Sequence, residues 1–227
     1  MRLAIFAQLS LAATVVAAIP YHQYILAPSS RTLRPATVYA RHGSLSAESA
    51  LLEGHKSSTG PPLVLHAFNS SVTYDFGKNI AGLVNLEVTS RNGSVGVTFT
   101  ESSLWVSSAF SDPSADPAGM DTRLLFNITS PGLYEAPRKM ERGAFRYLTV
   151  VNLGTEELSI KDLWIYFTPM PHWPDNALQD YTGWFHSNDE KLNRYGDIYS
   201  SGVTHRLIED STAFGMQVLV LHVFYTA

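Results

Sequence analysis

Carboxylates are the side chains of this chain that could most readily do chemistry. Glycoside hydrolysis needs two of them at a fixed separation, one as the acid and one as the base or nucleophile. The chain offers several in strand-like or helix-like runs: Asp75, Glu87, Glu101, Asp121, Glu135, Glu141, Asp189 and Glu190. Their spacing singles out no pair, so the sequence assigns none of them to catalysis.

Other kinds of site find little support in the residue pattern. The acidic loop 111–121 carries Asp112, Asp116 and Asp121, oxygen ligands of the type that calcium takes, but two prolines interrupt it and its spacing is not that of an EF-hand. The eight histidines show neither HxxxH nor HExxH spacing, which argues against zinc. The chain has no GxSxG elbow and no cysteine, so a hydrolase serine site, a thiolate and a disulfide are not expected. We expect no metal and no cofactor.

The triplet Asp75-Phe76-Gly77 is the one that binds magnesium in protein kinases. A kinase also needs a glycine-rich loop, a strand lysine and a catalytic-loop aspartate, and the chain has none of these motifs. We therefore interpret the triplet as the end of a strand, where Gly77 relieves a bend.

The N-terminal residues, the net charge and the sequons predict the location and the partners of the protein. Arg2, an apolar run and small residues up to Ala18 have the layout of a secretory signal peptide (1–18), with an uncleaved membrane anchor as the alternative. The mature protein is expected to be secreted and extracellular, with no membrane partner. The net charge of −4 offers no basic patch, so no nucleic-acid partner is expected. Three downstream sequons predict N-glycosylation: Asn69, Asn92 and Asn127.

The elements that must position these residues are short strands. After an irregular lead-in (19–60), with one strand near "TVYARH", alternating or β-rich runs recur between turn signals at 63–68, 71–77, 80–90, 95–102, 122–129, 133–137, 144–153 and 158–169. The Asn-Gly pair within 91–94 predicts a hairpin turn. The pattern predicts a mainly β fold, a jelly-roll-like antiparallel β-sandwich over 61–170.

The pattern changes after residue 170. A proline-broken linker (171–182) leads to a predicted amphipathic helix within 183–212, with Ser187 or Asn188 as its cap. A single helix after a complete sandwich resembles the start of a second, helical domain that the chain does not complete. The apolar tail 213–227 is interpreted as aberrant, either a short buried strand or the product of out-of-frame coding.

Several runs together resemble a known family. The runs "YDFGKNIAGLVNLEV", "TFTESSLW", "LYEAP" and "GAFRYLTV", followed by "GWFHSNDEKLNRYGDIYSSGVTHRL", are similar in order and spacing to α-L-rhamnosidases, inverting glycoside hydrolases with a β-sandwich and an (α/α)6 barrel. The resemblance covers residues 63 to about 210 and departs from the family at Tyr195-Gly196 and after Asp210. It implies that the full-length enzyme releases terminal rhamnose from glycosides with two barrel carboxylates. Those positions lie beyond this chain, so no catalytic residue is assigned and the chain alone is expected to be inactive.

The same resemblance gives two runs a scaffold role. Its motif residues here are Asp75, Phe76, Gly77, Asn79, Phe145, Arg146 and Tyr147. Arg146 is expected to pair with strand-end carbonyls or with a carboxylate, and Asp75, Glu101 and Glu135 all remain open as that carboxylate.

A non-catalytic, secreted carbohydrate-binding sandwich is the alternative function. Tryptophan can stack on sugar rings, and the chain has Trp105, Trp164, Trp173 and Trp184. Trp105 and Trp164 lie in strand-like runs and are expected in the core, whereas Trp173 and Trp184 lie in the linker and at the start of the helix. A coding region without a stable product is the third hypothesis.

Overall fold

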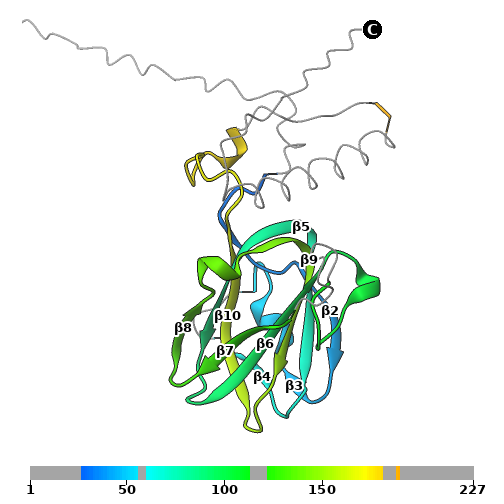
Figure 1. Cartoon of the computed structure of the whole chain (residues 1–227), viewed down its shortest axis with the longest axis vertical. Coiled ribbons are helices and arrows are strands. Elements are labelled where there is room, and N and C mark those ends of the chain that lie inside the picture. The colour runs from blue at the N-terminus through cyan, green and yellow to red at the C-terminus, as the bar shows by residue number, and fades with distance from the viewer. Residues whose placement is uncertain (1–26, 56–59, 113–121, 181–187, 190–227) are drawn as a thin grey trace, which may run out of the picture.

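The protein is an antiparallel β-sandwich. The computed structural model describes residues 27–55, 60–112, 122–180 and 188–189, and in this part of the chain ten strands are linked by antiparallel pairs (Figure 1). The strands are β1 (Thr32–Leu33), β2 (Thr37–His42), β3 (Leu45–Ser46), β4 (Leu63–Leu65), β5 (Ser71–Val88), β6 (Gly93–Thr100), β7 (Leu124–Ile128), β8 (Gly132–Glu135), β9 (Arg142–Asn152) and β10 (Leu158–Phe167). In the described residues four short 3-10 helices accompany them: η2 (Glu48–Leu51), η3 (Ser103–Trp105), η4 (Arg138–Met140) and η5 (Leu178–Asp180). The predicted mainly β, antiparallel fold is confirmed.

Strand β5 belongs to both layers of the sandwich. Its first part, 71–75, pairs with β2 and β9, and β9 continues to β6 and β7. Its last part, 82–88, pairs with β10, and β10 continues to β1, β4 and then β3. On its other side β9 still pairs at Ile80 and Gly82, and β8 pairs from Asn85 to Val88. Between the two parts the chain bends at Gly77, whose φ of +78° lies in the left-handed region that favours glycine. Gly77 thus has the backbone conformation that the predicted bend needs, but the triplet is not the end of a strand: the two strands predicted at 71–77 and 80–90 are one strand, β5.

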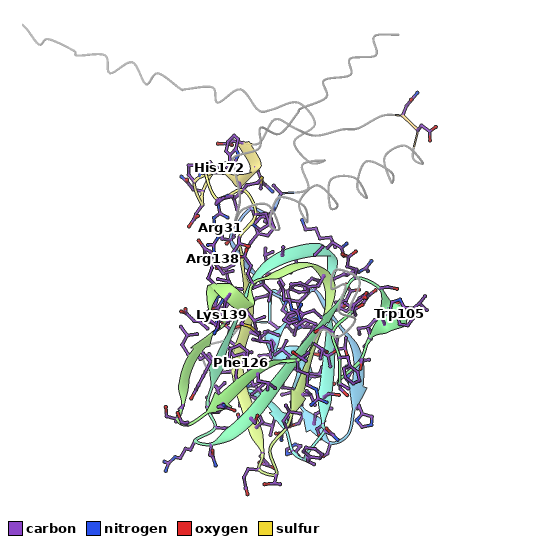
Figure 2. All side chains as sticks on the ribbon, in the orientation of Figure 1. Arg31, Trp105, Phe126, Arg138, Lys139 and His172 are labelled. Carbon is purple, nitrogen blue, oxygen red and sulfur yellow. The ribbon has the colours of Figure 1, made fainter. Side chains whose placement is uncertain are left out.

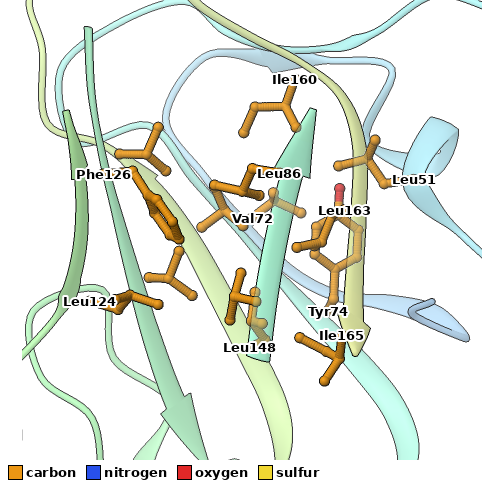
Figure 3. Packing of buried hydrophobic residues seen from close by; sticks show 14 of the residues in the cluster. Leu51, Val72, Tyr74, Leu86, Leu124, Phe126, Leu148, Ile160, Leu163 and Ile165 are labelled. Carbon is orange, nitrogen blue, oxygen red and sulfur yellow. The ribbon is translucent and has the colours of Figure 1, made fainter. Parts of the chain in front are cut away.

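The core lies between the two parts of β5. Alternation along the strands turns one side chain in two inward, so Val72 and Leu148 from one layer meet Leu86, Leu163 and Ile165 from the other (Figure 3). Tyr74 is also fully buried, and its hydroxyl donates to the carbonyl of Glu48 at 2.8 Å.

Two differences from the sequence prediction concern pairing. The segment expected to be an irregular lead-in contributes β1, β2, β3 and η2, and β2 is the predicted "TVYARH" strand. The hairpin predicted at 91–94 is wrong, because β6 pairs with β7 and β9 and not with β5. The last part of β5 already has β8 and β10 on its two sides, so the chain crosses to the other layer instead of turning back.

Arg31 fixes the segment that follows the last strand. Its side chain is 6% exposed and donates to the carbonyls of Phe167, Pro169, Met170 and Trp173, while it pairs with Asp175 (Figure 2). The described part of the predicted linker is thus bound to Arg31, the residue directly before β1. No motif or spacing in the sequence singles out this arginine.

Other predictions lie outside the described residues. They are the signal peptide 1–18, the helix within 183–212, the tail 213–227, Asp116, Asp121, Trp184 and Glu190. No helix among the residues that the structure describes is long and apolar enough to cross a membrane.

The close approach of β5 and β10 at Gly82 gives a test of the fold. A Cβ at Gly82 would overlap the carbonyl oxygen of Tyr166 and lie 2.9 Å from Ile165 Cγ2. We expect Gly82→Ala to lower the free energy of unfolding by about 3 kcal/mol or more, since backbone strain and overpacking add. Gly132 has the same φ of +153° but nothing within 4 Å of an added Cβ, so Gly132→Ala is the matched control. Equal urea midpoints for the two variants would contradict this packing.

Candidate functional site

The two motif runs meet in one ion pair. Arg146 on β9 donates from Nε to Asp75 Oδ1 at 2.8 Å and from its terminal nitrogen to Oδ2 at 2.9 Å. Asp75 pairs in register with Tyr147, beside the irregular stretch where β5 bends. The backbone N–H of Gly77 also donates to Asp75 Oδ1, at 2.6 Å. Of the partners left open for Arg146, the structure selects Asp75, at the point where β5 leaves one layer for the other.

The electrostatics of this pair fit a structural role. The hydrogen bonds from Arg146 lower the pKa of Asp75 below its ordinary value, against a smaller effect of burial, and the same bonds raise the pKa of Arg146. The carboxylate therefore stays ionised and bound. Phe145, the preceding residue, lies in the core against Phe76 and Phe99, with ring centroids 5.9 and 5.0 Å away.

Two of the other predicted carboxylates, Glu101 and Glu141, have structural contacts. Glu101 accepts from Asn79 Nδ2 at 3.3 Å, and Glu141 pairs with Arg138 at 3.3 Å. Within the described ranges, no group of three His, Asp or Glu side chains is placed to hold a metal ion. These contacts give no acid and base arrangement for glycoside cleavage.

A hollow of about 220 Å³ lies on the outer face of the layer that β8, β5 and β10 share. Strand register places three of its residues in a row: Glu135 on β8 is opposite Asn85 on β5, which is opposite Trp164 on β10. Neighbouring strands lie about 4.8 Å apart, so the row crosses about 10 Å of the sheet. The other residues that line the hollow are Leu83, Ala136 and Tyr166.

The hollow presents aromatic and polar groups side by side. Leu163 and Ile165 turn into the core, so Trp164 and Tyr166 turn outward, the tyrosine being 41% exposed. Asn85 is 5% exposed, and its Nδ2 donates to the Leu83 carbonyl at 3.1 Å. One amide hydrogen and the Oδ1 atom then make no hydrogen bond with the described residues. This arrangement can take a ligand that has both an apolar face and hydroxyl groups.

Sequence reasoning missed most of this site. Both tryptophans expected in the core are elsewhere: Trp164 lines the hollow and Trp105 is 65% exposed, projecting from η3 (Figure 2). Alternation along 158–167 is the signal that could have placed Trp164 outward, because it shares a strand face with Asp162 and Tyr166. Trp173 is partly buried and its carbonyl accepts from Arg31.

The three sequon asparagines, Asn69, Asn92 and Asn127, are exposed. They lie at one end of the sandwich, since the Asn69 N–H donates to the Asn152 carbonyl, the Leu153 N–H donates to the Ser94 carbonyl, and Ser94 pairs in register with Asn127. Their glycosylation stays a prediction.

This structure is similar in fold to several solved structures, whereas its sequence has no match. No protein-family model and no curated protein sequence matches the chain. The structure is similar to a rhamnosidase from Klebsiella oxytoca with rhamnose bound (17% identity, TM-score 0.39, 64% of this chain and 30% of that one). It is also similar to a GH78 family rhamnosidase of Bacillus sp. GL1 (18%, 0.39, 51% and 12%) and to a Streptococcus pneumoniae fucose binding module (16%, 0.36, 60% and 96%).

All three names refer to a sugar, rhamnose or fucose. The chain spans 30% and 12% of the lengths of the two rhamnosidases. All three TM-scores lie below 0.5, so the similarity extends to the fold and not to the site.

The Asp75–Arg146 pair predicts a pH-dependent part of the stability. Because the pKa of Asp75 is lower in the folded state, the pair stabilises the fold above the unfolded aspartate pKa of about 3.9 and loses this effect as the pH falls through the folded value. Asp75→Asn keeps an acceptor for Gly77 and removes the charge. We expect it to lower the free energy of unfolding by about 1 kcal/mol at pH 7, since Arg146 is partly exposed.

The measurement is urea unfolding of both proteins from pH 7 into the acid range, where the difference is expected to shrink once the pH is below about 3.9 and to be lost as the pH falls through the lowered folded-state pKa of Asp75. Glu101→Gln, which keeps an acceptor for Asn79, is the control and should change little. A difference for Asp75→Asn that is independent of pH, or absent at pH 7, would contradict this role.

Proposed function

We propose that this β-sandwich binds carbohydrate and belongs to the N-terminal part of a secreted α-L-rhamnosidase-like glycoside hydrolase. The observation that carries the proposal is the row Glu135–Asn85–Trp164 in the hollow on the outer face of β8, β5 and β10. In this proposal the sandwich supplies binding, and the resemblance assigns the two catalytic carboxylates to a helical barrel.

The chemistry of the hollow suits a sugar ring. A pyranose has an apolar C–H face that packs on an aromatic ring, and Trp164 and Tyr166 offer such rings. Its hydroxyls donate and accept hydrogen bonds, for which the Asn85 amide and the Glu135 carboxylate are present. The volume of about 220 Å³ is smaller than the roughly 300–1,000 Å³ of pockets that enclose drug-sized ligands. It therefore suits one ring held at the surface.

The motif runs support the glycosidase part of the proposal. The runs that carry the resemblance, around Asp75 and around Arg146, lie 71 residues apart and meet in a two-bond ion pair. The two runs occur together because Asp75 and Arg146 form the ion pair that holds β5 at the start of its bend. Secretion follows from the predicted signal peptide, and rhamnose-containing glycosides are the proposed ligands of the full-length enzyme.

Replacing Trp164 tests the binding function. Titration of the purified chain by calorimetry with rhamnose and plant oligosaccharides is expected to show saturable binding in the millimolar range. Trp164→Ala should weaken it at least about tenfold, which is about 1.4 kcal/mol. Trp105→Ala removes an indole that is 65% exposed and does not line the hollow, so it is the matched control. If no saccharide binds the wild-type chain, or if Trp105→Ala has the larger effect, the proposal fails.

The chain alone is expected to be inactive as a hydrolase. Purified protein should release no nitrophenol from 4-nitrophenyl α-L-rhamnoside above the rate of buffer, because the contacts of Asp75, Glu101 and Glu141 are structural and provide no acid and base pair. Turnover that disappears in Glu101→Gln or Asp75→Asn, with the fold intact by circular dichroism, would overturn this expectation.

A further inference from the structure

We infer that the hollow selects neutral sugars over anionic ones and that Glu135 sets this selection. The inference rests on the proposed sugar binding and adds the class of ligand. It starts from the charges around the row of Glu135, Asn85 and Trp164.

Glu135 is the only charged side chain among the described residues that line the hollow. The rest of the lining is one amide, two aromatic rings and two aliphatic side chains. Glu135 is exposed and lies one strand away from Asn85 and two strands away from Trp164. A ring stacked on Trp164 therefore reaches Asn85 directly and points its far substituents toward the carboxylate.

The neighbouring charges on this face do not neutralise that carboxylate. Arg34 donates to both oxygens of Asp162, at 3.2 and 2.8 Å, and this hydrogen bonding raises the pKa of Arg34. The positive charge of Arg34 is therefore bound to Asp162 and not to Glu135. Glu87 is two residues from Asn85 on β5 and adds a second, exposed carboxylate to the same strand face.

The nearest cations in the sequence follow Ala136. Arg138 pairs with Glu141 at 3.3 Å, and Lys139 is exposed on η4 (Figure 2). Neither residue lines the hollow. A ligand held by Trp164 and Asn85 is thus next to negative charge.

A carboxylate in this position has opposite effects on two kinds of ligand. It accepts hydrogen bonds from the hydroxyls of a neutral sugar, which are charge-assisted and strong. It repels the carboxylate of a uronic acid or the sulfate of a sulfated sugar. This repulsion between like charges weakens binding even of a ligand that fits the hollow sterically.

Matched ligands test the inference on the purified chain. Methyl glucoside and methyl galactoside differ from their uronides only in the group at C6, and they are titrated at low salt beside rhamnose. We expect each neutral glycoside to bind at least about tenfold more tightly than its uronide, with the ratio falling as added salt screens the repulsion.

Glu135→Gln keeps the size and hydrogen-bonding capacity of the side chain and removes its charge. It should lower the ratio of neutral to anionic affinity toward one, with Glu87 leaving a smaller residual preference, whereas Lys139→Gln should leave the ratio at or above its wild-type value. If Glu135→Gln does not fold, the salt dependence of the ratio in the wild-type chain decides instead.

The outcomes separate this inference from the proposed function. If none of the saccharides binds the wild-type chain, the proposed function itself fails. If neutral sugars and uronides bind equally, if the ratio ignores salt, or if folded Glu135→Gln keeps the wild-type ratio, sugar binding stands and the role of Glu135 is overturned.

Discussion

The sandwich depends on one strand that is shared by both layers. Strand β5 pairs with β2 and β9 in its first part and with β10 and β8 in its last part, so the chain between must bend while both ends stay in register. Gly77 allows the bend with a positive φ, and Gly82 lets the backbone of β10 approach where any side chain would overlap. The Asp75–Arg146 pair holds the strand at the start of this bend.

The candidate site is a consequence of that bend. Because the last part of β5 lies in the second layer, its alternation turns Val84 and Leu86 into the core and Asn85 outward between β8 and β10. The amide is held between Glu135 and Trp164 by strand register and by its hydrogen bond to the Leu83 carbonyl. Side chains on the shared strand of a sheet keep such positions firmly, since both neighbours restrain the backbone. A ligand would meet a prearranged surface there.

The two ends of the sandwich have different neighbours. The three sequons lie where β10 begins, near the turn that follows Asn152, and Arg31 binds the chain where β10 has ended at Phe167. The ten residues of β10 separate these places by about 30 Å. Glycans on Asn69, Asn92 and Asn127 would therefore leave the segment that Arg31 holds uncovered.

The sequence by itself determined the mainly β fold, most of the strand ranges, the bend at Gly77 and the pairing need of Arg146, because these depend on local periodicity and on the conformational limits of single residues. It did not determine the partner of Arg146, the outward position of Trp164 or the row that Trp164 forms with Asn85 and Glu135. Those depend on register between strands far apart in the chain, and a shift of one residue would turn each of these side chains to the other face. The hairpin predicted at 91–94 is wrong for the same reason. The Asn-Gly pair indicates a turn, but it does not say which strand the next segment pairs with. Because β8 and β10 already pair with the last part of β5, the next strand joins the other layer.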